Sequence, residues 1–326
     1  MSRLRLGTRG SRLALVQSRA VAAALEAHGA DVELVEIRTT GDRIKDVALG
    51  PSIGQSFFTK ELEDALLDGR ADLAVHSCKD LATRLPDGLV IGAVLEREDP
   101  RDVLVSALGA LADLPPGATV GTASVRRRRF LELARPDLEV RDLRGNVPRR
   151  VAAVDEGRFD AVVLAAAGLH RLGLGDRITE YLPTGLILPA AAQGAVAVQI
   201  RADDHATRAR VARLDHPETR ACVTVERTCL RALEAGCQAP VGALATMGGG
   251  GGLTLDAAVV LDGRVVRTRV SGPPTDADRL GEEAASALLS ALGLDSLAHT
   301  PWAGPPPRRL EPEGTGDTGP TGDTAS

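Results

Sequence analysis

The first hundred residues alternate between short apolar runs and segments in which apolar residues recur every three or four positions, patterns typical of buried strands and amphipathic helices. They predict a strand at Leu4–Thr8, a helix at Ser11–His28 and a strand at Asp31–Thr39. A helix at Thr59–Asp68 and a buried strand at Asp72–His76 follow. This alternation indicates an open α/β sheet, which binds its ligands beyond the carboxyl ends of its strands.

The same alternation returns from about residue 100 and predicts a second α/β domain. Its expected strands are Val103–Ser106, Thr119–Gly121, Leu138–Arg141 and Ala161–Ala165, and its expected helices are Ser124–Ala134 and Val151–Glu156. The apolar strand Ala195–Ile200 is expected to return to the first domain.

From Pro217 the pattern changes and predicts a small third domain of the α+β class, with a helix through Cys222–Ala235. Its remaining elements are expected to be strands at Leu244–Met247, Leu253–Leu261 and Arg264–Val270 and a helix at about Asp276–Leu292. The Pro- and Gly-rich segment 303–326 is predicted to be disordered because it has few apolar side chains to bury. The expected domains are 1–95 with 190–214, 100–188 and 217–302.

The overall composition disfavours a polyanionic partner. The 326 residues carry a net charge of −5 with one Trp, one Tyr and four Phe, so binding to nucleic acid or to a membrane surface is not expected. Four cysteines without a C-x-x-C pair favour a reducing, cytoplasmic location. No signal peptide, membrane-spanning stretch or metal-site spacing is expected from the sequence.

The basic residues are unusual because only Lys45, Lys60 and Lys79 are lysines, which leaves 36 arginines among 39 cations. A bias in base composition explains part of this excess, but Arg is also the planar, bidentate donor that carboxylates and phosphates bind. Residues 121–150 hold nine arginines and four acids, a local net charge of +5, whereas the rest of the chain carries −10. The average charge therefore hides one strongly basic segment.

Within this basic segment, Gly121–Arg129 combines a Gly-Thr-x-Ser turn with the start of a helix, which exposes backbone N–H groups and hydroxyls to an anion. Arg126 and Arg127 fall on the first helical turn, where the helix dipole disfavours cations, so an anionic ligand is expected to offset them. A second Arg cluster follows at Leu143–Arg150. The alternative interpretation is a solvated basic face without a ligand.

Two other loops carry reactive residue types. In His76–Asp80, neighbours in an extended segment point in opposite directions, which disfavours a catalytic triad. Asp80 is then either a general acid or base or a turn residue. Cys237 lies in the loop Gly236–Gly242 without a neighbouring His, which makes it a candidate nucleophile or covalent attachment point.

Together these segments resemble the porphobilinogen deaminase family of tetrapyrrole biosynthesis. The resemblance is collinear from Leu4 to about Pro301 and rests on seven separate motifs: Thr8-Arg9-Gly10-Ser11 with Leu13-Ala14-Leu15, Phe58-Thr59-Lys60-Glu61-Leu62-Glu63, His76-Ser77-Cys78-Lys79-Asp80, the turn Gly121–Arg127, Leu143-Arg144-Gly145-Asn146-Val147, Leu188-Pro189-Ala190 with Gln193-Gly194-Ala195, and Gly236-Cys237-Gln238. It implies two α/β domains built like periplasmic binding proteins around a cleft, plus the small C-terminal α+β domain.

The resemblance also implies a function. Members of this family are transferases that join four porphobilinogen molecules head to tail, with loss of ammonia, to give linear hydroxymethylbilane. Their dipyrromethane cofactor is held through a thioether, here on Cys237, and their catalytic carboxylate is here Asp80. Asp80 would assist departure of the amino group, stabilise the positive azafulvene and help remove the α-proton.

Each pyrrole ring of substrate and cofactor carries an acetate and a propionate, which gives the arginines a ligand. The family's binding residues fall on Arg9, Ser11, Phe58, Lys79, Thr122, Ser124, Arg126, Arg127, Arg144, Arg150 and Gln193. We expect a monomer whose partner is the small molecule porphobilinogen, and a loop Thr40–Ser56 that can move over the cleft.

Two positions depart from the family pattern: Gln55 stands where Lys is common and Ala82 where Pro is common. These two differences are also compatible with a divergent or weakly active paralogue of the family. A non-catalytic, two-lobed anion-binding module would use the same lobes with an unmodified Cys237. Binding of nucleic acid through residues 121–150 is a third hypothesis, which the acidic remainder of the chain disfavours.

Overall fold

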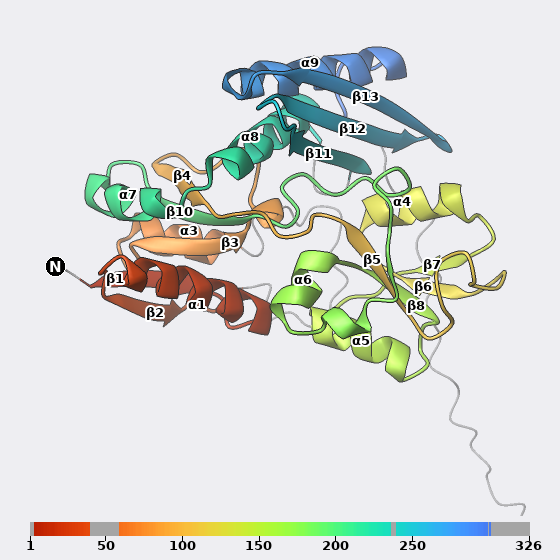
Figure 1. The fold of residues 1–326 in the computed structure, drawn as a ribbon, viewed down its shortest axis with the longest axis horizontal. Coiled ribbons are helices and arrows are strands. Elements are labelled where there is room, and N and C mark those ends of the chain that lie inside the picture. The colour runs from red at the N-terminus through yellow and green to blue at the C-terminus, as the bar shows by residue number, and fades with distance from the viewer. Residues whose placement is uncertain (1–2, 40–58, 236–238, 299, 301–326) are drawn as a thin grey trace, which may run out of the picture.

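The computed structural model describes residues 3–39, 59–235, 239–298 and 300, and these form three sheets, each with its own helices (Figure 1). The N-terminal sheet has the strand order β2-β1-β3-β10-β4. Its strands are β1 (Leu4–Thr8), β2 (Val32–Glu36), β3 (Leu73–Ser77), β4 (Leu89–Val94) and β10 (Val196–Arg201), and its helices are α1 (Arg12–Ala27), α3 (Lys60–Leu67) and α7 (His205–Val211).

Strands β1, β2 and β3 of this sheet are parallel, whereas β10 runs antiparallel to both β3 and β4. The predicted return of the strand near residue 196 to the first sheet is therefore confirmed. Helix α1 begins directly after Ser11, whose Oγ accepts a hydrogen bond from the backbone N–H of Ala14 (3.3 Å). Strand β3 is almost entirely buried, as its run of apolar residues predicts.

The second sheet repeats this arrangement with the order β7-β6-β8-β5-β9. Strands β6, β7 and β8 are parallel, and β5 runs antiparallel to β8 and β9. Its elements are β5 (Asp102–Ser106), β6 (Thr119–Gly121), α4 (Val125–Ala134), β7 (Glu139–Arg141), α5 (Val147–Asp155), β8 (Ala161–Ala165), α6 (Ala166–Arg171) and β9 (Glu180–Tyr181).

The third sheet is an antiparallel meander that has different neighbours on its two faces. Its elements are α8 (Pro217–Ala232), β11 (Val241–Met247), β12 (Leu253–Leu261), β13 (Arg264–Gly272) and α9 (Ala277–Leu292). Ala257 and Val259 on β12 pack with α8 and α9, whereas the alternating Ala258 and Val260 pack with Phe130 of α4. The small domain therefore shares a core with the second lobe, above which it lies in Figure 1.

Several boundaries differ from the predictions. The helix expected to begin at Val151 begins at Val147, because Asn146 caps it through a hydrogen bond from Arg149 N (3.0 Å). Strand β11 begins at Val241 rather than Leu244, and the strand expected to reach Thr39 ends at Glu36. Strands β4 and β9 and helices α6 and α7 had not been predicted.

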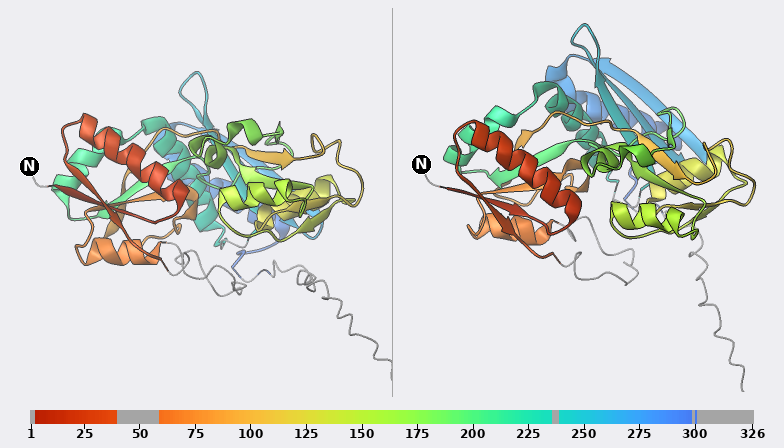
Figure 2. Two further views of the ribbon diagram at one scale, coloured as in Figure 1. Left: turned by 90° about the horizontal axis from the view of Figure 1, so that it is seen from below. Right: turned by 60° about the horizontal axis from the view of Figure 1, so that its bottom comes forward.

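The chain passes between the two larger sheets twice, from β4 to β5 and from β9 to β10. Helix α1 of the first lobe contacts α6 of the second, and the views of Figure 2 show the two lobes side by side. Within the described residues, no helix is both long and apolar enough to cross a bilayer. The predicted segment 303–326 and the loop Thr40–Ser56 lie outside the described residues.

Candidate active site

A cavity of about 90 Å³ lies between the two larger lobes. The N-terminal lobe lines it with Ser77, the last residue of β3, and with Lys79 on the turn that follows. The second lobe lines it with Arg127 and Arg150. Gly194, on the connection between the lobes, completes the wall. The carboxyl ends of parallel strands in α/β sheets are where ligands bind, and here both lobes contribute to one site.

Asp80 ends the short 3-10 turn η2 (Cys78–Asp80), which follows β3 directly. It is exposed, and in the described part of the chain its carboxylate accepts no hydrogen bond. Its charge acts on the pKa of Lys79 and of Arg150, both of which line the cavity. A carboxylate that lies near cations and accepts no hydrogen bond from the described residues is available to take or give a proton.

Lys79 keeps partial exposure to the cavity, but the surrounding protein strongly affects its charge. Its Nζ donates a hydrogen bond to Oε1 of Gln193 (3.1 Å). Burial lowers the pKa of Lys79 to about 8, and Arg127 adds to the effect. Lys79 is therefore a cation whose charge responds to pH near neutrality.

Arg126 and Arg127 on α4 are both 5% exposed and share one buried anion, Asp102. Arg127 also donates from Nη1 to the carbonyl of Val163 (3.1 Å), and Arg126 from Nη1 to the carbonyl of Leu188 (2.6 Å). Burial alone would raise the pKa of Asp102, but the two guanidiniums outweigh it and hold that pKa far below its usual range. The anion that the helix dipole led us to expect is thus supplied, at least in part, by the protein.

The hydroxyls of Thr122 and Ser124 serve the start of α4. Ser124 is the N-cap, and its Oγ accepts a hydrogen bond from the N–H of Arg127 (3.4 Å). Thr122 is 1% exposed, and its Oγ1 accepts from the N–H of Ser124 (3.2 Å). Both residues orient the helix that carries the two arginines, and neither lines the described cavity.

The remaining cationic candidates lie at different depths. Burial lowers the pKa of Arg150 to about 10, and its Nε donates to the carbonyl of Gly145 (2.7 Å). Arg144 is exposed and pairs with Asp142 (3.0 Å), outside the cavity wall. Arg9 follows β1 and lies close enough to His76 to affect its protonation, and Ser11 is occupied in capping α1.

Two predicted residues, Phe58 and Cys237, lie outside the described residues. The other three cysteines, Cys78, Cys222 and Cys229, are buried free thiols. Burial raises the pKa of Cys78 and Cys222 to about 11 and that of Cys229 to about 12, so they remain protonated and unreactive near neutral pH.

Three residues of this site were not predicted from the sequence. Asp102 joins Arg126 and Arg127, Arg171 lines the cavity and donates to the carbonyl of Gly194 (2.6 Å), and Gln17 lines it beside Ser77. Only Asp102 had a signal in the sequence, and it was weak. This acid stands directly before the apolar run of β5, where its charge would be buried and would need a cationic partner.

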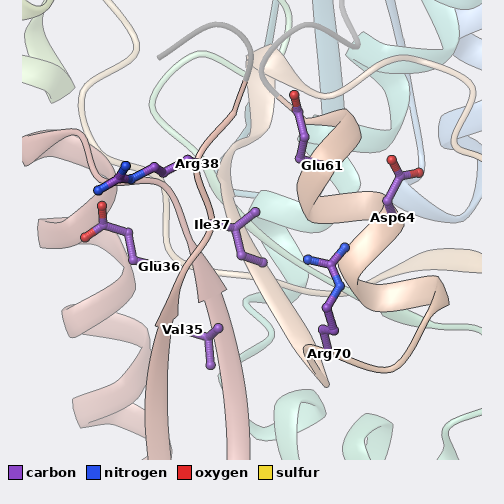
Figure 3. Close-up of a pocket in the computed structure, with 7 residues that line it drawn as sticks. All are labelled: Val35, Glu36, Ile37, Arg38, Glu61, Asp64 and Arg70. Atoms are coloured by element: carbon purple, nitrogen blue, oxygen red, sulfur yellow. The ribbon is translucent and has the colours of Figure 1, made fainter. Parts of the chain in front are cut away.

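A larger cavity, of about 380 Å³, lies away from this site (Figure 3). Its wall consists of Val35, Glu36, Ile37, Arg38, Glu61, Asp64 and Arg70, at the edge strand β2 and helix α3. None of the predicted site residues belongs to it, and it is open to solvent. Size alone therefore does not identify the site, whereas the gathering of cations at the strand ends does.

The fold and the site define a two-lobed α/β protein with a small α+β domain and a cationic cavity between the lobes. The family model for the porphobilinogen deaminase, dipyromethane cofactor binding domain matches residues 4–209, and that for the porphobilinogen deaminase C-terminal domain matches residues 220–290. The chain belongs to the porphobilinogen deaminase family.

Curated relatives agree over nearly the whole chain. The porphobilinogen deaminase of Syntrophobacter fumaroxidans is 48% identical over 88% of this chain and 94% of its own length. That of Desulforudis audaxviator is 52% identical over 90% of this chain and 96% of its own. Among solved structures, a methionine-bound nutrient binding protein from Burkholderia cenocepacia matches 64% of this chain and 89% of its own at 15% identity, with a TM-score of 0.40.

Proposed function

We propose that this protein is a transferase that joins four porphobilinogen molecules head to tail, with release of ammonia, and gives hydroxymethylbilane. The observation that carries the proposal is that Lys79, Arg127 and Arg150 line one cavity, while Asp80, on the same turn as Lys79, accepts no hydrogen bond from a described residue. Porphobilinogen carries two carboxylates and one aminomethyl group on a pyrrole ring. The cations match the carboxylates, and Asp80 matches the amine.

Asp80 acts at the atoms that exchange protons. It assists protonation of the aminomethyl nitrogen, so that the carbon–nitrogen bond breaks and ammonia leaves. Its carboxylate then stabilises the positive charge left on the pyrrole. When the α-carbon of another ring has attacked the methylene carbon, Asp80 helps to remove the α-proton, which restores the aromatic ring.

The cations fix the ring that reacts. Arg127 and Arg150 approach from the second lobe and Lys79 from the first, so a substrate held by all three lies between the lobes. Holding the reacting carbons in a defined orientation contributes to the rate by removing their freedom of movement. Arg9, Ser11, Phe58, Thr122, Ser124, Arg126, Arg144 and Gln193 are proposed to serve the same binding, directly or by supporting it.

A dipyrromethane cofactor fits the chemistry of this site because its two rings present four carboxylates to the same cations. Lys79, Arg126, Arg127 and Arg150 would hold these carboxylates, and Cys237 would carry the thioether. The three described cysteines are buried, protonated thiols, which supports Cys237 as the attachment residue. When bound, the cofactor supplies the pyrrole α-carbon to which the first substrate is joined.

We further propose that the chain functions as a cytoplasmic monomer with the domains 1–95 with 190–214, 100–188 and 217–302. The strand pairing of β10 with β3 and β4 supports the discontinuous first domain. Buried free cysteines are typical of a reducing compartment. Light scattering of the purified protein tests the oligomeric state.

Intact-mass spectrometry of protein expressed in a porphobilinogen-making host tests the function. We expect an adduct equal to two pyrrole units on the wild type and none on Cys237→Ser. Cys222→Ser is the matched control, and it should keep the adduct. Asp80→Asn should keep the fold and lose nearly all turnover.

The outcomes separate the hypotheses. An unmodified wild type without turnover would indicate a non-catalytic anion-binding module. Normal turnover of Asp80→Asn would contradict the role assigned to Asp80. Steeply salt-dependent binding to DNA or RNA would instead support the nucleic-acid hypothesis.

A further inference from the structure

The buried carboxylate of Asp102 joins side chains from both lobes. Asp102 is the first residue of β5 and is 0% exposed. Its Oδ1 accepts hydrogen bonds from Nε (3.0 Å) and Nη2 (2.7 Å) of Arg127 and from Nε2 of Gln193 (2.9 Å). Its Oδ2 lies 2.8 Å from Nη1 of Arg126. One carboxylate thus fixes the orientation of two guanidiniums and one amide.

Gln193 extends this network to the N-terminal lobe. Its Oε1 accepts the hydrogen bond from Nζ of Lys79 (3.1 Å), while its Nε2 donates to Asp102 and to the carbonyl of Pro100 (2.7 Å). An amide accepts at oxygen and donates at nitrogen, so Gln193 is the group that can join an anion to a cation. Lys79, on the turn after β3, is therefore oriented through Gln193 by a residue of the second sheet.

The charges around Lys79 give Asp102 a second effect. Lys79 faces Asp80 on its own turn, Arg126 and Arg127 on α4, and Asp102 on β5. Burial and the two arginines lower the pKa of Lys79, whereas Asp80 and Asp102 raise it. Without the charge of Asp102, only Asp80 would offset the two guanidiniums, so the pKa of Lys79 would fall further.

We propose that Asp102 is the positioning residue of the carboxylate-binding site: it holds Arg126 and Arg127 directly, and Lys79 through Gln193, in the one arrangement that lets these cations bind the same substrate. The inference rests on the function proposed above. Asp102 itself touches no substrate because it is fully buried beneath the groups it orients. Loss of its charge should therefore weaken substrate binding more than it slows the proton transfers at Asp80.

Steady-state kinetics on Asp102→Asn, Asp102→Glu and Asp160→Asn provide the first test. Asp160 is the matched control, because it is a partly buried carboxylate directly before β8 whose Oδ2 accepts hydrogen bonds from the N–H (2.7 Å) and Oγ1 (2.8 Å) of Thr119. We expect Asp102→Asn to raise KM for porphobilinogen about tenfold or more with a smaller loss of kcat. Asp102→Glu keeps the charge but displaces it, so KM should rise while Lys79 keeps its pKa. Asp160→Asn should leave both kinetic constants unchanged.

A titration that needs no activity provides the second test. The chain has three lysines, so protein labelled with 13C at lysine Cε gives three resonances, which Lys45→Arg, Lys60→Arg and Lys79→Arg assign. We expect the Lys79 resonance to titrate near pH 8 in the wild type. In Asp102→Asn it should titrate about half to one pH unit lower, and in Asp102→Glu and Asp160→Asn at the wild-type position.

The two tests distinguish an error in the proposed function from an error in the role proposed for Asp102. If the wild type has neither adduct nor turnover, the proposed function is wrong, and the Lys79 titration still decides whether Asp102 controls this cation. If Asp102→Asn does not fold, Asp102→Glu decides, because an unchanged KM in that variant contradicts a positioning role. An Asp102→Asn protein with wild-type KM and an unshifted Lys79 resonance overturns the proposal.

Discussion

Arg97 and Glu226 form a bidentate ion pair that joins the connection leaving the N-terminal lobe to helix α8. Nη1 of Arg97 lies 2.6 Å from Oε1 of Glu226, and Nη2 lies 3.2 Å from Oε2. Glu226 is fully buried and also accepts hydrogen bonds from the backbone N–H groups of Ala192 (2.5 Å) and Ala245 (2.7 Å). One carboxylate therefore holds both connections between the lobes and strand β11 of the small domain.

Glu226→Gln should lower the free energy of unfolding by about 3 kcal/mol, because it leaves the guanidinium of Arg97 buried without a counter-charge. Glu218→Gln, an exposed residue on the same helix, should change it by less than about 0.5 kcal/mol. Urea unfolding followed by circular dichroism measures both. Equal midpoints for the two variants would show that Glu226 does not hold the three domains together.

His76 should make the protein less stable as the pH falls below neutrality. Its side chain is buried, its Nε2 has no hydrogen-bond partner among the residues that the structure describes, and burial lowers its pKa to about 4. Between pH 6.5 and 4 the unfolded chain binds a proton that the folded protein does not, so stability is lost as pH falls through this window. Wild type should lose about 2 kcal/mol more than His76→Gln between pH 7 and pH 5.

The control for this titration is His28→Gln, an exposed histidine at the end of α1. Its unfolding midpoints at pH 7 and pH 5 should differ as much as those of the wild type. A His76→Gln protein with the same loss as the wild type would mean that other groups cause the acid sensitivity.

Gly194→Ala should disturb the turn that carries Gln193 into the site. Gly194 has φ +91°, and a Cβ there would lie 2.2 Å from the carbonyl oxygen of Glu98, which is backbone and cannot move aside. We expect a loss of about 2 kcal/mol or more in stability and a raised KM. Gly185→Ala is the control, since it has open space and no positive φ. If the two variants melt at the same temperature, the turn tolerates the side chain.

The sequence predicted most elements of the fold because their signals are local. The helices expected from Ser11 and Ser124 begin directly after these residues, which cap them, and strand β12 lies where the alternating pattern places it. Strand β4 was missed because Gly92 interrupts its apolar run. A Cβ at Gly92 would lie 2.8 Å from Val211 and 2.9 Å from Ile200, so the glycine reflects close packing rather than a turn.

The sequence predicted that the site binds anions, but it did not predict which residues pair with its arginines. The position of Arg126 and Arg127 on a first helical turn predicted an anion nearby, and part of that anion is Asp102. Nothing in the spacing connects β5 to α4, because strand order is set by long-range packing. Helix α6 was not predicted because it follows β8 directly and its N-cap residue, Ala165, has no side chain that could mark the start of a helix.

Arg227→Met should lower kcat while leaving substrate binding intact, given the function proposed for Asp80. Arg227 is 9% exposed, and its guanidinium donates to the carbonyls of Leu81 (3.2 Å), Ala82 (2.6 Å) and Thr83 (3.5 Å), directly after Asp80. Helix α8 thereby fixes the backbone that orients the carboxylate. Without this contact Asp80 reaches its productive position less often, and we expect kcat to fall about tenfold with KM within about twofold of the wild type.

Arg231→Met, on the same helix, is the control for this variant, because Arg231 pairs with Asp278 away from the Asp80 turn. Its kcat should match that of the wild type. Arg227→Lys should restore part of the rate, since an ammonium reaches one carbonyl but lacks the forked donors that hold three. A wild-type kcat in Arg227→Met would show that the turn keeps Asp80 in place without α8, whereas a rise in KM alone would assign Arg227 to the shape of the binding site instead.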